Sequence, residues 1–141
     1  MVELHKNTAS EIEEMIKNKK ITSTEVVEYF LKRIESIDGK IGAIATVTTE
    51  RARRTSKAVD TENTDGLELA GVPIIIKDNI VSHGDITSSA SKILKNYKGT
   101  YDATVVRKLE ENMIPILGKA NMDEFAMGSS NENSSIKNVS N

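Results

Sequence analysis

Residues 71–79 read Gly-Val-Pro-Ile-Ile-Ile-Lys-Asp-Asn, and they decide the fold of the chain around them. Pro73 has no N–H to give to a ladder, so it is expected at the first residue of a strand. The three isoleucines after it are β-branched and apolar, which is typical of a strand with neighbours on both sides and both faces covered. We therefore expect a central strand that ends at Lys77, with the lysine side chain starting inside the protein.

A lysine in that position has a chemical consequence. A buried ammonium is costly, so the side chain either gains strong partners or lowers its pKa and becomes a potential base. The structural alternative is a strand-end lysine whose ammonium reaches water along its alkyl stem or pairs with Asp78 or another carboxylate. Position alone favours the structural alternative.

Two capping boxes mark helix starts upstream of this strand. Residues 8–11 read Thr-Ala-Ser-Glu and residues 22–25 read Thr-Ser-Thr-Glu, each followed by apolar residues at helical spacing. The pattern predicts a helix over residues 8–18 and a second that begins at Thr22 and ends at Asp38-Gly39.

The next segments predict a strand and a third helix. Residues 41–47 have the small and apolar side chains of a strand that another element approaches closely. Residues 49–58 predict a helix, on which Arg51, Arg53 and Arg54 are expected to form a solvated face.

The second half of the chain predicts a βαβ unit. A polar loop over residues 60–68 precedes the Lys77 strand, and a turn near residues 83–85 and a short helical piece near 90–96 follow it. Asp102 is expected to cap a helix that runs to about Asn112, with Ala103, Val106 and Leu109 inward. Pro115 then opens a strand over 116–118, parallel to the first. The residues from 131 onward are polar and expected to fray.

The expected fold class is α/β, with helices flanking a mixed, partly parallel sheet in a single domain over residues 1–141. Residues 1–59 form a helical start with one strand, and residues 69–130 form the lysine strand and the βαβ unit.

Composition excludes several classes of function. With 38% hydrophobic and 28% charged residues the chain is not compositionally disordered, and a net charge of -2 gives no electrostatic case for direct nucleic-acid binding. The absence of cysteine excludes disulfides and thiolate metal sites. No apolar run approaches the ~20 residues of a membrane span and the start of the chain lacks a secretory pattern, so a cytoplasmic protein without membrane contact is expected.

Four ordered blocks resemble the amidase signature family. They are residues 71–79, 88–94, 101–106 and 118–130, the last of which reads Gly-Lys-Ala-Asn-Met-Asp-Glu-Phe-Ala-Met-Gly-Ser-Ser. Within the family they look like the branch of the A subunits of glutamyl-tRNA(Gln) amidotransferases. The resemblance covers nearly the whole chain, and it implies that the chain is the N-terminal part of an amidase signature fold.

The resemblance assigns Lys77 as the terminal base of a Ser–Ser–Lys relay. The nucleophilic serine and the bridging serine of such a relay lie in a Gly/Ser-rich segment, and no glycine follows Gly128 in these 141 residues. This chain is therefore expected to be inactive by itself. The resemblance also implies that the backbone of Met127, Gly128 and Ser129 lines the amide-binding pocket.

The remaining polar residues predict structural roles. Ser88, Ser89 and Ser91 are expected to form caps and turns. Asp123 and Glu124 are expected to cap and charge a helix start, and Lys119 to fix a carboxylate near the site. His5 and His83 are isolated, so no metal site is expected.

By resemblance, the parent reaction is hydrolysis of glutamine to glutamate and ammonia. The ammonia would pass to a B subunit, which uses ATP and magnesium to amidate Glu-tRNA(Gln) or Asp-tRNA(Asn), while a C subunit wraps the interface. No cofactor is expected in this chain, and tRNA contact is expected only through the B subunit. Two alternatives remain open: part of a stand-alone amidase, or a non-enzymatic remnant that binds a partner subunit.

Overall fold

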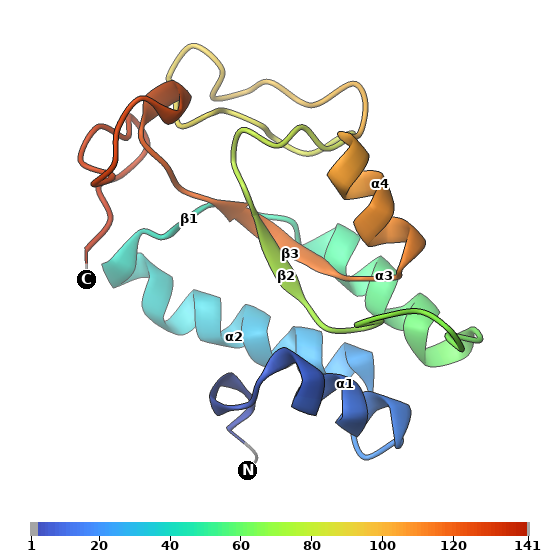
Figure 1. Ribbon diagram of the computed structural model, residues 1–141. Coiled ribbons are helices and arrows are strands. Elements are labelled where there is room, and N and C mark those ends of the chain that lie inside the picture. Colours follow the sequence, from blue (N-terminus) through green and yellow to red (C-terminus); the bar gives the residue numbers. More distant parts are fainter. Residues whose placement is uncertain (1–2, 141) are drawn as a thin grey trace.

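The computed structural model describes residues 3–140 (Figure 1). Its helices and strands follow one another along the chain in the order α, α, β, α, β, α, β, with a 3₁₀ turn near each end. They are η1 (Leu4–Lys6), α1 (Ala9–Lys17), α2 (Ser23–Ile41), β1 (Ile44–Val47), α3 (Thr49–Thr61), β2 (Ile74–Lys77), α4 (Thr104–Glu111), β3 (Ile116–Ala120) and η2 (Glu124–Ala126).

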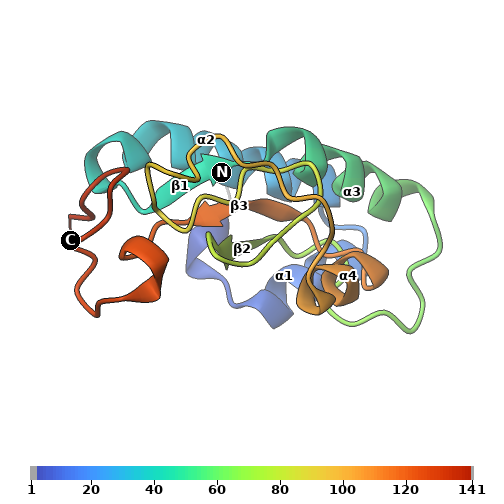
Figure 2. The same ribbon diagram turned by 90° about the horizontal axis from the view of Figure 1, so that it is seen from above.

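The elements form three layers, with the sheet in the middle. The strand order is β1-β3-β2, in which β3 pairs antiparallel with β1 and parallel with β2. Helices α2 and α3 cover one face of the sheet and α1 and α4 lie on the other side, as the view from above shows (Figure 2). The expected α/β class and the parallel βαβ pair are both confirmed.

Three apolar clusters hold the layers together. Ile76, Val106 and Ile116 join the sheet to α4, with Ala103 and Leu109 packed against them as the helix pattern predicts. A second cluster joins α2 and α3 to the sheet through Val27, Leu31, Ala52 and Leu117. A third packs η1 and α1 on α2 through Leu4, Ile12, Val26 and Val72.

Both predicted helix starts are confirmed, whereas the predicted end of the second helix is wrong. Thr8 and Thr22 each form a complete capping box with the glutamate three residues later. Helix α2 continues past Gly39 to Ile41 and ends at Gly42, which has the left-handed φ of +74°. The strand after it therefore begins at Ile44 and not at residue 41.

The predicted Lys77 strand is present, and among the described residues it lies at the edge of the sheet and not at its centre. The central strand is β3, and β2 has a strand neighbour on one side only. Ile74 is consequently 39% exposed and only Ile76 is fully buried in this strand. The apolar run correctly identified a strand, but the neighbour that a fully apolar strand requires is not found within residues 3–140.

Two further expectations differ from the structure. Residues 90–96 form turns with no regular helix. The N-cap of α4 is Ala103, because the carboxylate of Asp102 instead accepts a hydrogen bond from His83 N at 2.7 Å. Among residues 3–140, no helix has both the length and the apolar character that a membrane crossing needs.

Candidate functional site

The candidate site lies where β2 and β3 end. Lys77 is the last residue of β2, and its pairing partner is Ala120 at the end of β3. The Lys77 side chain is exposed, and its ammonium makes no hydrogen bond or ion pair within residues 3–140. The expectation that this side chain starts inside the protein is not met in the described chain, because Lys77 and the buried Ile76 point to opposite faces of β2 and the face of Lys77 is open to solvent at the strand end.

The residue after Lys77 is fully buried. The backbone N–H of Asp78 donates to Ala120 O at 3.0 Å, which continues the ladder past the strand end. Its carboxylate Oδ2 accepts from Ser88 Oγ at 2.5 Å and from Ala90 N at 3.1 Å. Ser88 thus serves in a turn, as the sequence predicted, and Asp78 ties the strand end to that turn.

Lys119 is the buried lysine of this site. It lies beside Ile76 in the β2–β3 register and is 0% exposed. Its Nζ donates to Ile80 O and, at 3.0 Å, to Thr87 Oγ1. Burial lowers the pKa of the Lys119 ammonium below its ordinary value, and the carboxylates of Asp78 and Asp85 act in the opposite direction.

The structural role expected for Lys119 is thus partly correct. Its direct partners are a carbonyl and a hydroxyl of the loop after β2, and the nearby carboxylates act on it only through their charge. Lys119 is buried because β3 is the central strand of the described sheet, and the sequence around it carries no local signal of that position.

Met127, Gly128 and Ser129 are all exposed, Met127 by 73%. The loop that carries them is organised by Asp123, whose buried carboxylate accepts from Asn131 N at 3.0 Å and Asn133 N at 2.9 Å. This differs from the helix-capping role expected for Asp123, because its side chain makes no cap hydrogen bond to η2. A Cβ at Gly128 would overlap that carboxylate, so the close approach requires glycine.

The structure connects this loop to the Lys77 strand indirectly. Phe125 N donates to Ser89 O at 3.0 Å, and Ser135 N donates to Ala90 O at 3.1 Å. The same segment, residues 88–91, is held by Asp78. Lys77 and the Met127–Ser129 loop are thereby attached to one shared turn.

A buried arginine, Arg51, lies on α3 and contacts the loop that follows β2. Its Nε is 2.7 Å from Asp85 Oδ2, its Nη1 pairs with Glu110, and its Nη2 donates to His83 O at 2.7 Å. The solvated face expected for Arg51, Arg53 and Arg54 is therefore wrong at Arg51. Sequence reasoning could not find this residue, because all its partners come from distant segments.

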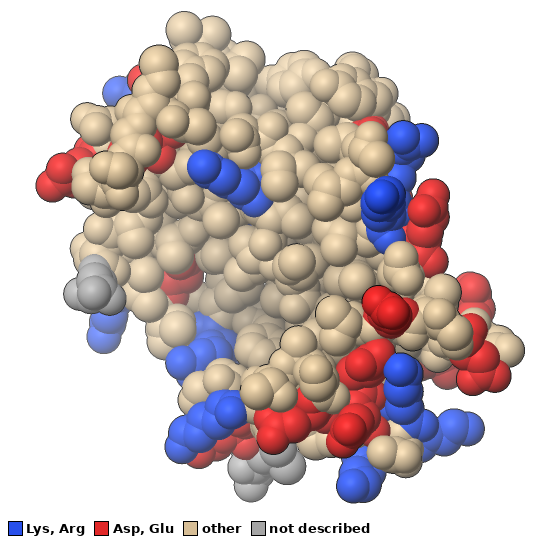
Figure 3. Space-filling view, in the orientation of Figure 1, with Lys and Arg blue, Asp and Glu red and all other residues tan. Residues whose placement is uncertain are grey.

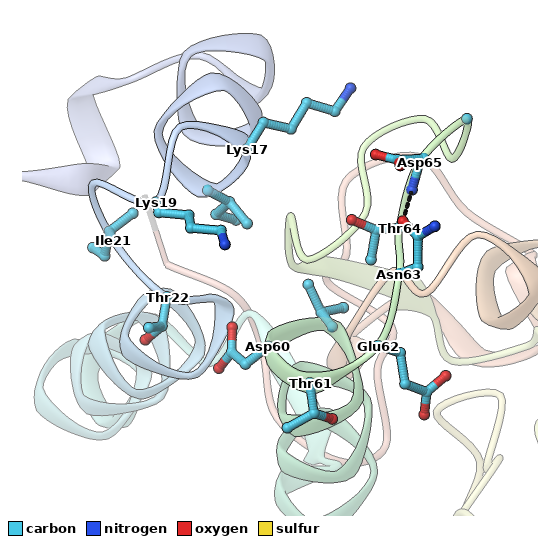
Figure 4. A pocket seen from close by; sticks show the side chains of 13 residues that line it. Lys17, Lys19, Ile21, Thr22, Asp60, Thr61, Glu62, Asn63, Thr64 and Asp65 are labelled. Atoms are coloured by element: carbon cyan, nitrogen blue, oxygen red, sulfur yellow. Dashed lines mark hydrogen bonds between the residues drawn. The ribbon is translucent and has the colours of Figure 1, made fainter.

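A cavity of about 820 Å³ lies elsewhere, between the end of α1 and the end of α3 (Figure 4). It is at the end of the sheet where β2 begins, opposite Lys77 (Figure 1). Asp60 in its wall is already engaged, because its carboxylate accepts from Ser23 N at 2.7 Å and Thr24 N at 3.0 Å at the start of α2. We therefore do not assign the cavity to the Lys77 site.

Within residues 3–140, no group of three His, Asp or Glu side chains is arranged to hold a metal ion. His83 is exposed, and His5 Nδ1 lies 2.5 Å from the Tyr29 hydroxyl. Chemically, the site offers one exposed amine on a well-held strand end, joined through residues 88–91 to the exposed loop of Met127–Ser129.

Comparison with known proteins by family model, by sequence and by structure finds relatives of one kind. Residues 25–141 match the protein-family model described as Amidase. The chain is 50% identical over 143 residues to the A subunit of the glutamyl-tRNA(Gln) amidotransferase of Clostridium novyi, covering 99% of this chain and 30% of that protein. The chain thus spans about 30% of the length of this curated relative.

Solved structures share the same fold. The crystal structure of the A subunit of glutamyl-tRNA(Gln) amidotransferase from Thermotoga maritima is similar at a TM-score of 0.74 and 34% identity, over 96% of this chain and 27% of that one. The structure of 6-aminohexanoate cyclic dimer hydrolase is similar at a TM-score of 0.86 and 27% identity, over 100% of this chain and 28% of that one.

Proposed function

Because the chain belongs to the amidase family, we propose that it is the N-terminal part of the glutamine-hydrolysing subunit of a tRNA-dependent amidotransferase. The observation that carries the proposal is the 50% identity to such a subunit over 99% of the chain. The position of Lys77 at the end of a strand, attached through residues 88–91 to the Met127–Ser129 loop, supports it.

In this proposal Lys77 is the base of the relay. A serine hydroxyl becomes a nucleophile only when an adjacent base takes its proton, and a lysine does so only as a neutral amine. An ordinary lysine has a pKa near ~10.4, so the amine must be desolvated to work at neutral pH. The exposed Lys77 side chain leaves room for the segment that carries the two serines to cover it.

The pocket and the partners follow from the same proposal. The exposed backbone of Met127, Gly128 and Ser129 would form one wall of the glutamine site. The ammonia would pass to a B subunit that uses ATP and magnesium, while a C subunit wraps the interface and tRNA is bound through the B subunit. We assign no cofactor to residues of this chain and place the protein in the cytoplasm.

The test is Lys77→Ala in the full-length protein, assembled with its partners. Glutamine-dependent amidation should fall to background, while amidation with added ammonia should stay within about twofold, because the relay serves only ammonia production. Lys77→Arg should fail equally, since a guanidinium does not give up its proton at working pH. Loss of both reactions in an assembled complex would show that Lys77 is structural and would overturn its assignment.

Two alternative functions are separated by simple measurements. A stand-alone amidase, as the similarity to 6-aminohexanoate cyclic dimer hydrolase allows, would release ammonia from amides at a rate that B and C subunits do not change. A non-enzymatic remnant would have a stop codon directly after Asn141 and would release no ammonia from glutamine above its Lys77→Ala variant.

A further inference from the structure

A second lysine, Lys119, lies one register position from Lys77 on the adjoining strand. Lys119 pairs with Ile76, and Lys77 pairs with Ala120. Lys77 is exposed and Lys119 is 0% exposed. Lys119 is therefore not available to act on a substrate at the surface, and its burial needs another explanation.

The contacts of Lys119 show what it holds. Its ammonium donates to Ile80 O, three residues after Lys77, and to Thr87 Oγ1. Hydrogen bonds from a charged donor are roughly twice as strong as neutral ones, and more so away from water. Thr87 is itself buried, so the bond attaches the far end of the loop to β3.

Asp78 completes the attachment from the other side. It follows Lys77 directly, and its carboxylate holds Ser88 Oγ and Ala90 N. Lys119 and Asp78 together fix residues 80, 87, 88 and 90 against the ends of β2 and β3. Burial lowers the pKa of Lys119, and the charge of the Asp78 carboxylate acts in the opposite direction.

We propose that Lys119 and Asp78 are a pair of positioning residues that fix the strand end carrying Lys77 and the turn on which the Met127–Ser129 loop rests. The proposal rests on the proposed function, because it names what orients the base of that relay. Neither residue touches the substrate. They act through the backbone of Asp78 on one side and through residues 88–91 on the other.

The first test compares Lys119→Met with wild type in the full-length complex. Methionine fills a similar volume but cannot donate, so kcat for glutamine hydrolysis should fall about tenfold or more, the loss expected for a charged hydrogen bond. KM for glutamine should change less than about twofold, and ammonia-dependent amidation should be retained. Lys108→Met, which makes the same change at an exposed lysine on α4, should change none of these.

Two matched variants distinguish positioning from simple stability. Thr87→Val removes the hydroxyl that Lys119 holds and should lower kcat in the same direction, whereas Thr87→Ser keeps it and should restore kcat. The double variant Asp78→Asn/Lys119→Met should lose less than the product of the two single losses, because both residues hold the same loop, Lys119 through residues 80 and 87 and Asp78 through residues 88 and 90. A kcat for Lys119→Met equal to wild type, or multiplicative losses, would overturn the proposal.

Hydrogen exchange tests the same pair independently of the reaction. In Lys119→Met the amides of Asp78 and Ala90 should exchange about tenfold faster, while that of Ile12 on α1 should not change. If the wild-type complex had no glutaminase activity but Lys119→Met still produced this change in exchange, the proposed function would be overturned, while the attachment of the loop by Lys119 would stand. Unchanged exchange at both amides would overturn the positioning role.

Discussion

At the scale of single residues, Arg51 is a buried cation held by several carboxylates. Its guanidinium lies within 4 Å of three carboxylates, from Asp85, Asp102 and Glu110, and is almost fully buried. Arg51→Met would leave three carboxylates around a site without their cation, which typically costs about 3–5 kcal/mol of unfolding free energy. Arg51→Lys should recover only part of the lost unfolding free energy, because an ammonium cannot reach several carboxylates at once as the planar guanidinium does with its five N–H donors.

Arg54 is the matched control for this prediction. It lies on the same helix and is exposed, so Arg54→Met should change the unfolding free energy by less than about 0.5 kcal/mol. The measurement is urea unfolding of each variant at low protein concentration. Similar costs for the two substitutions would contradict the buried role of Arg51.

Lys119 gives a second prediction at this scale, on pH dependence. Burial lowers its folded-state pKa, so between that value and the unfolded value near ~10.4 the unfolded chain binds more protons. Stability contributed by this site should therefore rise with pH through that window. The test measures the unfolding free energy of wild type minus that of Lys119→Met at a series of alkaline pH values. This difference should increase as the pH rises. A difference that stays constant or falls would contradict the lowered pKa of Lys119.

These residues show where sequence reasoning stops. Arg51 and Arg54 are three apart on one helix and have the same local pattern, so only the loop containing Asp85, far along the chain, decides which is buried. Lys77 ends β2, and Lys119 is the next-to-last residue of β3, so both lie at the ends of apolar strands. The resemblance assigned the role of Lys77, but which lysine is desolvated depends on strand order, which no local pattern specifies.

At the scale of elements, two glycines near the end of α2 make opposite predictions. Gly42 has a φ of +74°, and a Cβ there would lie 2.8 Å from Lys137 Cδ, so Gly42→Ala should destabilise the chain by about 1 kcal/mol or more. Gly39 lies within the helix and has open space around it. Gly39→Ala should stabilise the chain by up to about 1 kcal/mol. Urea unfolding of both variants tests the pair, and a shared sign would contradict the placement of the helix end.

The same helix explains which elements the sequence could predict. Its start was predicted correctly because a capping box is complete within four residues, Thr22 to Glu25. Its end was misplaced because Asp38-Gly39 resembles a stop signal, whereas the structure uses Gly42, against which Lys137 packs from the far end of the chain. Helix ends fixed by tertiary contacts are not encoded locally.

At the scale of the whole molecule, the sheet of the described chain has an open edge at β2. Strand β2 pairs only with β3, and Ile74 on it is 39% exposed. Most charged side chains on this side of the molecule lie toward its rims, and only a few Lys or Arg side chains lie in the central part (Figure 3). An apolar strand edge whose charge is confined to its last residue, Lys77, is a template for pairing with another chain.

The isolated 141-residue chain should therefore self-associate through β2 as its concentration rises. Ile74→Lys should weaken the association, because a charge on an edge strand opposes pairing with a second chain. Ile93→Lys is the matched control: Ile93 is more exposed, at 86%, but it lies in a turn segment without a strand edge. Sedimentation velocity over a concentration series should show a smaller species for Ile74→Lys and wild-type behaviour for Ile93→Lys. Equal effects of the two substitutions would mean that association follows general exposure of apolar side chains and not the edge of β2.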